Sequence, residues 1–184
     1  MSRQPRALVV VAAALAALVG AMSGADATVE ATCMAAVESD QRVNFGVCTS
    51  ELGKHRDSPD ADTWGLAKVA ANVGVSSAGG AVNDVDALLA ARPPPDAKEA
   101  ELLRRCRKVF FDMELAFAGA YDEINARNYT AGKLVAAEGA NLVRRCGGGF
   151  ADAGLLTPPL IEQRGAYAME IATICTAITN LIKP

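Results

Sequence analysis

The stretch from Glu99 to Cys146 constrains this chain more than any other, because it has the pattern of two consecutive helices. We predict the first from Glu99 to about Ala126 and the second from Thr130 to Cys146. If the two run antiparallel across their short connector, Cys106 and Cys146 lie together, and a disulfide could join them. Apolar residues of the first helix recur at the three-then-four spacing of one buried face: Leu102, Cys106, Val109, Phe110, Met113, Phe117, Ala120 and Ile124.

Two further long helices are expected to pack against this pair. One begins with Ser58 as its N-cap, continues past the glycine pair at 79–80 without dividing, and ends at the prolines 93–95. The glycines at 147–149 are expected to stop the second central helix sharply. Thr157 is expected to cap the last helix.

The composition supports an all-α fold. Hydrophobic residues make up 51% of the chain but aromatic residues only 5%, which suits closely packed helices better than a β-sandwich. We predict an up-down-up-down four-helix bundle over residues 58–184. An N-terminal helical hairpin and linker over residues 28–57 would precede the bundle.

Residues 1–27 have the features of a secretory signal peptide. Arg3 and Arg6 form the positive start, residues 7–19 are apolar, and Ala25 and Ala27 flank a cleavage site. The apolar run is shorter than the roughly 20 residues of a membrane span. We therefore predict a secreted protein without a membrane anchor. Removing two arginines and one aspartate from 18 basic and 21 acidic residues leaves a net charge of −4, which disfavours binding to nucleic acid.

All five cysteines lie in the predicted mature chain, and secretion favours disulfides. Four can pair and one is left over, but four cysteines allow three connectivities, so spacing alone selects none. A bridge between Cys33 and Cys48 would close a small N-terminal hairpin and stabilise it by roughly 3 kcal/mol. Cys175, on the apolar face of the last helix, is expected to be a buried and inert thiol.

The residues that could carry catalysis do not form a recognisable site. His55 is the only histidine, and its polar linker predicts a solvated side chain. The acid pairs Asp112/Glu114 and Asp122/Glu123 point apart on a helix, and no cysteine has a partner at metal-ligand spacing. We predict that the protein is not an enzyme and has no metal or cofactor.

Three other features have a structural and a functional explanation. Basic residues at 104–108 are followed by Arg144 and Arg145, and they form either a patch for an acidic partner or charges around a buried disulfide. Asn128 begins an Asn-x-Thr sequon and is a glycosylation candidate. Trp64 lies in the first turn of its helix and is expected to pack in the core rather than hold a ligand.

Taken together, several motifs are typical of one family. A signal peptide is followed by Cys33 and Cys48 in a small hairpin, two cysteines at 106 and 146, and a fifth near the C-terminus. Residues 43–48 read Val-Asn-Phe-Gly-Val-Cys, residues 128–131 read Asn-Tyr-Thr-Ala, and residues 157–160 read Thr-Pro-Pro-Leu. In these respects the mature chain resembles the plant invertase/pectin methylesterase inhibitors, and most of all a pollen-allergen-like subgroup named for invertase inhibition.

The resemblance implies two disulfides, Cys33 with Cys48 and Cys106 with Cys146, and leaves Cys175 free. It also implies a non-catalytic inhibitor, secreted to the apoplast and cell wall or to the vacuole. Such an inhibitor binds pectin methylesterase or an acid invertase one to one and occludes its active site.

Residues 127–129 read Arg-Asn-Tyr where invertase inhibitors of this family carry Pro-Lys-Phe. We therefore favour pectin methylesterase over invertase as the target. Alternatives from other classes are a small-ligand or lipid carrier, and a structural or allergen-like protein without inhibitory activity. The predicted target-binding residues lie on exposed faces of the central helices: Asp122, Glu123, Tyr129 and Lys133.

Overall fold

The structure is a computed structural model that describes residues 28–183. The predicted signal peptide, residues 1–27, lies outside the described residues. The described part is all-helical and contains no strand, which confirms the predicted fold class. Its six helices are α1 (Val29–Ser39), α2 (Phe45–Gly53), α3 (Thr63–Leu89), α4 (Ala97–Asn125), α5 (Tyr129–Asp152) and α6 (Pro159–Leu181).

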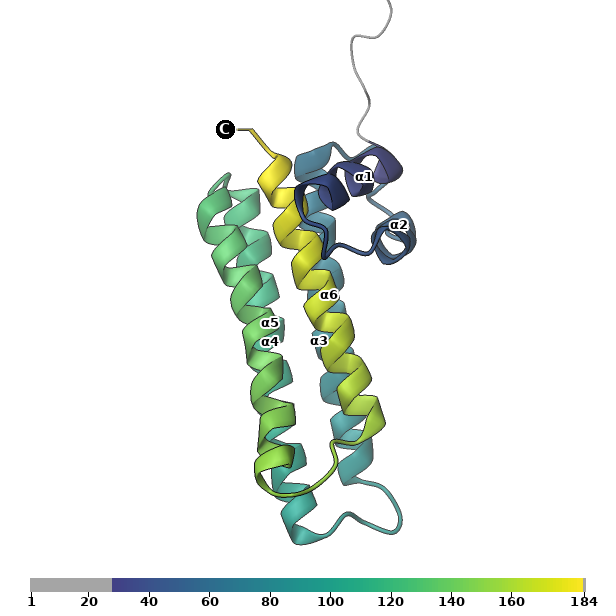
Figure 1. Ribbon diagram of the computed structural model, residues 1–184, viewed down its shortest axis with the longest axis vertical. Helices are drawn as coiled ribbons and strands as arrows, with labels where there is room; N and C mark the ends of the chain where they lie inside the picture. Colours follow the sequence, from purple (N-terminus) through teal and green to yellow (C-terminus); the bar gives the residue numbers. More distant parts are fainter. Residues whose placement is uncertain (1–27, 184) are drawn as a thin grey trace, which may run out of the picture.

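The four long helices α3 to α6 run alternately up and down (Figure 1). Each packs against its neighbours in the chain, and α3 also packs against α6, which closes the bundle. The short helices α1 and α2 form the hairpin at the end of the bundle where α6 finishes (Figure 1), and α1 packs mainly on α6. This arrangement is consistent with the predicted bundle, and it leaves the α4–α5 side uncovered by the hairpin.

The core is formed by the helix faces that point toward the bundle axis. Phe110, Phe117 and Phe150 are fully buried and are its largest side chains. On α4 the predicted buried face is observed at seven of the eight expected positions, and Val109 is half-buried. The buried members of that face are Leu102, Cys106, Phe110, Met113, Phe117, Ala120 and Ile124.

Two disulfides stabilise the fold, and they are the pairs that the family resemblance implies. Cys33 is bonded to Cys48 between α1 and α2, with their Cα atoms 5.8 Å apart. Cys106 is bonded to Cys146 between α4 and α5, with their Cα atoms 4.8 Å apart. Cys175 is free and buried.

The predicted end of the second central helix is wrong. Helix α5 continues through the glycines at 147–149 and ends at Asp152, and the chain turns at Gly154, which has a positive φ of 68°. Each glycine costs about 1 kcal/mol against alanine in a helix. Burial of Phe150 in the last turn offsets that cost, and the bond at Cys146 holds the start of the glycine segment on α4.

The predicted starts of two helices are also wrong. Helix α3 begins at Thr63, where the carboxylate of Asp62 accepts a hydrogen bond from the amide of Gly65 at 2.7 Å. Ser58 is buried instead, and its hydroxyl donates to the carbonyl of Leu52 at 2.6 Å. Helix α6 has Pro158 at its N-cap position and no side-chain cap, so Thr157 does not have the predicted role.

Candidate functional site

The four predicted target-binding residues flank the turn between α4 and α5. Asp122 and Glu123 are in the last turn of α4, and Asp122 is exposed. Tyr129 and Lys133 are at the start of α5 and are half-buried. The Lys133 ammonium donates to the side-chain oxygen of Asn180 at 2.7 Å, so this lysine is already held against α6.

The same turn is fastened to the start of α3 through Trp64. The indole N–H of Trp64 donates to the carbonyl of Ile124 at 2.9 Å. The Lys68 ammonium lies 3.5 Å and the Arg127 guanidinium 4.1 Å from the centre of the indole ring. Cations over an aromatic face are attracted to it. Trp64 therefore packs at the edge of the core as a structural residue, in agreement with its expected role.

Sequence reasoning missed three exposed apolar side chains on the outer faces of the same two helices. Phe111 and Leu115 on α4 are 46% and 56% exposed, and Leu134 on α5 is 68% exposed. Residues four apart lie on one side of a helix, so Phe111 and Leu115 are neighbours. The signal was present in the sequence, because both residues fall outside the buried spacing of α4. These three exposed apolar residues, Phe111, Leu115 and Leu134, are together called the outer patch below.

The basic cluster lies at the level of the Cys106–Cys146 bridge, as expected if the two helices are antiparallel. Most of its charges are paired: Arg104 and Arg105 contact Glu101, and Lys108 contacts Asp112. Two further pairs are Arg107 with Asp86 at 2.7 Å and Arg145 with Glu138 at 3.5 Å. These carboxylates neutralise much of the cluster, which favours the structural explanation over a site for an acidic partner.

His55 is not the solvated side chain that its polar linker predicts. The side chain is 20% exposed, and its Nε2 atom lies 3.2 Å from the side-chain nitrogen of Asn72 on α3. Its Nδ1 atom accepts a hydrogen bond from the amide of Asp57 at 3.3 Å. The linker folds back onto the bundle, a tertiary contact that the local sequence does not indicate. Between residues 28 and 183, no group of His, Cys, Asp or Glu side chains could hold a metal ion.

Asn128 is exposed and stands at the N-cap of α5. Its side-chain oxygen accepts a hydrogen bond from the amide of Ala131 at 3.5 Å, which leaves the side-chain nitrogen for a glycan. Glycosylation at Asn128 remains a prediction. Within the described residues, no helix is long and apolar enough to cross a membrane.

Comparisons with known proteins agree on one family. The family model described as plant invertase/pectin methylesterase inhibitor matches residues 27–178. The chain is 54% identical over 160 residues to "Pectinesterase inhibitor 8" of Oryza sativa subsp. japonica, covering 87% of this chain and 86% of the relative. It is 41% identical over 180 residues to "Pectinesterase inhibitor 12" of the same plant, covering 98% and 86%.

A solved structure shows the same fold. The crystal structure of a pectin methylesterase inhibitor from Arabidopsis thaliana matches with a TM-score of 0.59 and 13% sequence identity. The match covers 82% of this chain and 97% of the other. At this identity the likeness concerns the fold alone.

Proposed function

This chain belongs to the plant invertase/pectin methylesterase inhibitor family, and from that membership we propose that it inhibits pectin methylesterase by covering the enzyme's active site. The observation that carries the proposal is the 54% identity, over most of both chains, to a relative named as a pectinesterase inhibitor. Both relatives carry that name, which favours pectin methylesterase over an acid invertase as the target. In this proposal the protein acts outside the cell, as one inhibitor per enzyme, and performs no chemistry itself.

We assign the contact to the outer patch and the neighbouring α4–α5 turn. Large exposed apolar side chains are typical of surfaces that bind another protein, and the hairpin packs on α3 and α6 rather than on this side. Asp122 and Glu123 would supply charges at the edge of the contact, where they guide association more than they add affinity. Tyr129 and Lys133 would contribute from the start of α5.

The two disulfides support this mechanism physically. The bond between Cys106 and Cys146 holds together the two helices that carry the outer patch. Because a preorganised surface loses little conformational entropy on binding, more of the contact free energy remains as affinity. A rigid bundle can then block a pocket by steric occlusion alone.

Titration of a pectin methylesterase and of an acid invertase with the secreted protein tests the proposal. We expect loss of esterase activity, with one equivalent of inhibitor reaching full effect, and no loss of invertase activity. An esterase that stays fully active at micromolar inhibitor would overturn the proposed function.

A charge placed in the outer patch tests the assignment of the surface. Leu115→Arg should weaken inhibition at least about ten-fold, because it puts a charge into the centre of a desolvated contact. Met34→Arg on α1 is a matched control, since Met34 is 51% exposed and Leu115 is 56% exposed. Equal inhibition by both variants, with unchanged melting temperatures, would remove the outer patch from the contact.

A further inference from the structure

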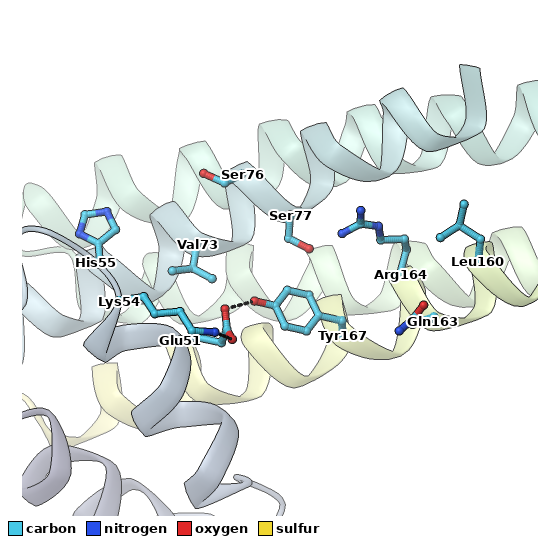
Figure 2. Close-up of a pocket in the computed structure, with 10 residues that line it drawn as sticks. All are labelled: Glu51, Lys54, His55, Val73, Ser76, Ser77, Leu160, Gln163, Arg164 and Tyr167. Atoms are coloured by element: carbon cyan, nitrogen blue, oxygen red, sulfur yellow. Dashed lines mark hydrogen bonds and ion pairs between the residues drawn. The ribbon is translucent and has the colours of Figure 1, made fainter. Parts of the chain in front are cut away.

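A polar groove lies on the surface between α3 and α6 where the end of α2 approaches them (Figure 2). It has a volume of about 600 Å³. Ser77 from α3 and Arg164 and Tyr167 from α6 point into it, and Glu51 and Lys54 close its end (Figure 2). None of these residues belongs to α4 or α5, so the groove is separate from the outer patch.

Ser77 is the unusual residue of the groove. It is only 8% exposed, and its hydroxyl is the one buried side-chain polar atom of residues 28–183 without a hydrogen-bond partner. Buried hydroxyls on a helix can satisfy themselves by donating to the carbonyl four residues earlier. Thr173, Thr176 and Thr179 on α6 do so at 2.9, 2.8 and 2.7 Å. An unsatisfied buried hydroxyl costs about 1–3 kcal/mol, so a partner that reaches the Ser77 hydroxyl from the groove would relieve that cost.

The other polar groups of the groove leave mainly hydrogen-bond donors free. Glu51 is occupied, because Lys54 donates to one of its oxygens at 2.8 Å and Tyr167 to the other at 2.7 Å. Arg164 donates through Nε to Asp84 at 2.6 Å, which leaves its two terminal nitrogens for a ligand. The amide of Gln163 also lines the groove and can both donate and accept.

We propose that this groove binds a polyhydroxylated carboxylate, that is, a sugar acid, with its carboxylate on Arg164 and a ring hydroxyl on Ser77. A planar guanidinium matches a carboxylate through paired hydrogen bonds. A serine hydroxyl and a glutamine amide both donate and accept, as sugar hydroxyls do. Val73, Leu160 and the ring of Tyr167 supply the apolar surface that small-ligand sites combine with a few polar groups.

The sugar acid has two sources, a free monosaccharide or a uronic acid unit of a polysaccharide. Calorimetric titration of the whole protein with galacturonate, with its trisaccharide, and with neutral galactose separates them. We expect saturable binding of the acids with a Kd below about 1 mM and none of galactose. A trisaccharide that binds at least ten-fold tighter than the monomer identifies polysaccharide as the source, and equal affinities identify the free acid.

Two variants test the contacts. Arg164→Gln should weaken acid binding at least about ten-fold, and Ser77→Ala about five-fold, because each removes a bond to the ligand. Ser77→Ala should nevertheless raise the melting temperature slightly, because it removes an unsatisfied buried hydroxyl. Arg42→Gln is the matched control, since Arg42 is exposed, pairs with Asp40 and lies outside the groove.

Absence of acid binding, equal binding of galactose, or unchanged affinity in both variants would overturn the groove proposal. The proposed inhibition is measured separately, on the enzyme, and Ser77→Ala should inhibit as the unchanged protein does. Acid binding without inhibition would therefore contradict the proposed function only, and inhibition without acid binding would contradict the groove only.

Discussion

Gly74 of α3 lies directly against the side chain of Phe117 of α4. A Cβ atom at this position would overlap the ring of Phe117, which is fully buried in the centre of the bundle. Gly79, five residues later on the same helix, has room, because a Cβ there would lie 3.5 Å from the carboxylate of Glu114, an ordinary contact. An alanine side chain would therefore clash with the core at Gly74 but fit without strain at Gly79.

We expect Gly74→Ala to lower the free energy of unfolding by about 1–3 kcal/mol, because the added methyl overpacks the core. Gly79→Ala should raise it by roughly 0.5–1 kcal/mol, because alanine loses less backbone entropy in a helix. Urea denaturation of both variants measures the two changes. A destabilised Gly79→Ala would show that α3 needs flexibility at this position.

Cys175 shows how burial controls chemistry at the residue scale. Burial raises the pKa of its thiol to about 12, and only the thiolate is a nucleophile. We expect no alkylation of the native protein at neutral pH and one alkylated thiol after denaturation, counted by mass spectrometry. Rapid labelling of the native protein would mean that Cys175 is open to solvent.

At the scale of elements, α4 and α5 depend on the bond between Cys106 and Cys146. The loop that it closes has a sequence separation of 40, for which the chain-entropy model gives about 4 kcal/mol. We expect Cys106→Ser to lower the melting temperature more than Cys175→Ser, which removes no cross-link. Equal losses in the two variants would mean that the cross-link contributes little to the folded bundle.

The hairpin is held to the bundle partly by Glu51 of α2. Hydrogen bonds from Lys54 and then Tyr167 hold the pKa of the Glu51 carboxyl below its ordinary value of 4.5. The Glu51 carboxylate therefore binds a proton more weakly in the native state than in the unfolded chain. This stabilisation is present above the ordinary pKa and is lost as the pH falls through the lowered value.

Glu51→Gln should therefore lower the melting temperature more at about pH 6 than at about pH 3. Glu38→Gln on the exposed side of α1 is the control, and it should change the melting temperature little at either pH. A Glu51→Gln effect of equal size at both pH values would mean that the carboxylate charge is not what holds the hairpin.

At the scale of the whole molecule, the two sides of the bundle are separate. The outer patch is on α4 and α5, whereas the polar groove is formed by α2, α3 and α6. Asn128 stands at the turn between α4 and α5, next to the predicted contact residues. A glycan on Asn128 would therefore crowd the α4–α5 side of the bundle and leave the polar groove unaffected.

We expect the secreted protein to lose mass on enzymatic removal of N-glycans, and Asn128→Asp to abolish that loss. Aspartate keeps the N-cap of α5, so the melting temperature should stay the same. The glycosylated protein should inhibit the esterase more weakly than Asn128→Asp, because the sugar crowds the turn. Equal inhibition would place the contact farther along the helices, at Phe111 and Leu115.

Apolar spacing along the chain was enough to predict which residues of α4 face the core and that four long helices form. Apolar spacing reports burial directly, so the inner face of α4 and the continuity of α3 across residues 79–80 could be predicted. Cysteine spacing left the pairing open, and the family resemblance supplied it. Phe111 and Leu115 could have been recognised as exposed, because they break the spacing of α4.

The helix ends that were predicted wrongly, and the surfaces that the helices form, depend on packing between segments far apart in the chain. Packing of Phe150 extends α5 through three glycines, and burial of Ser58 removes it from the cap position. The polar groove brings together residues from about 51 to 167 in the chain. Such features depend on contacts between distant segments, for which a local pattern has no signal, because helix propensities and caps are weaker than burial in the core.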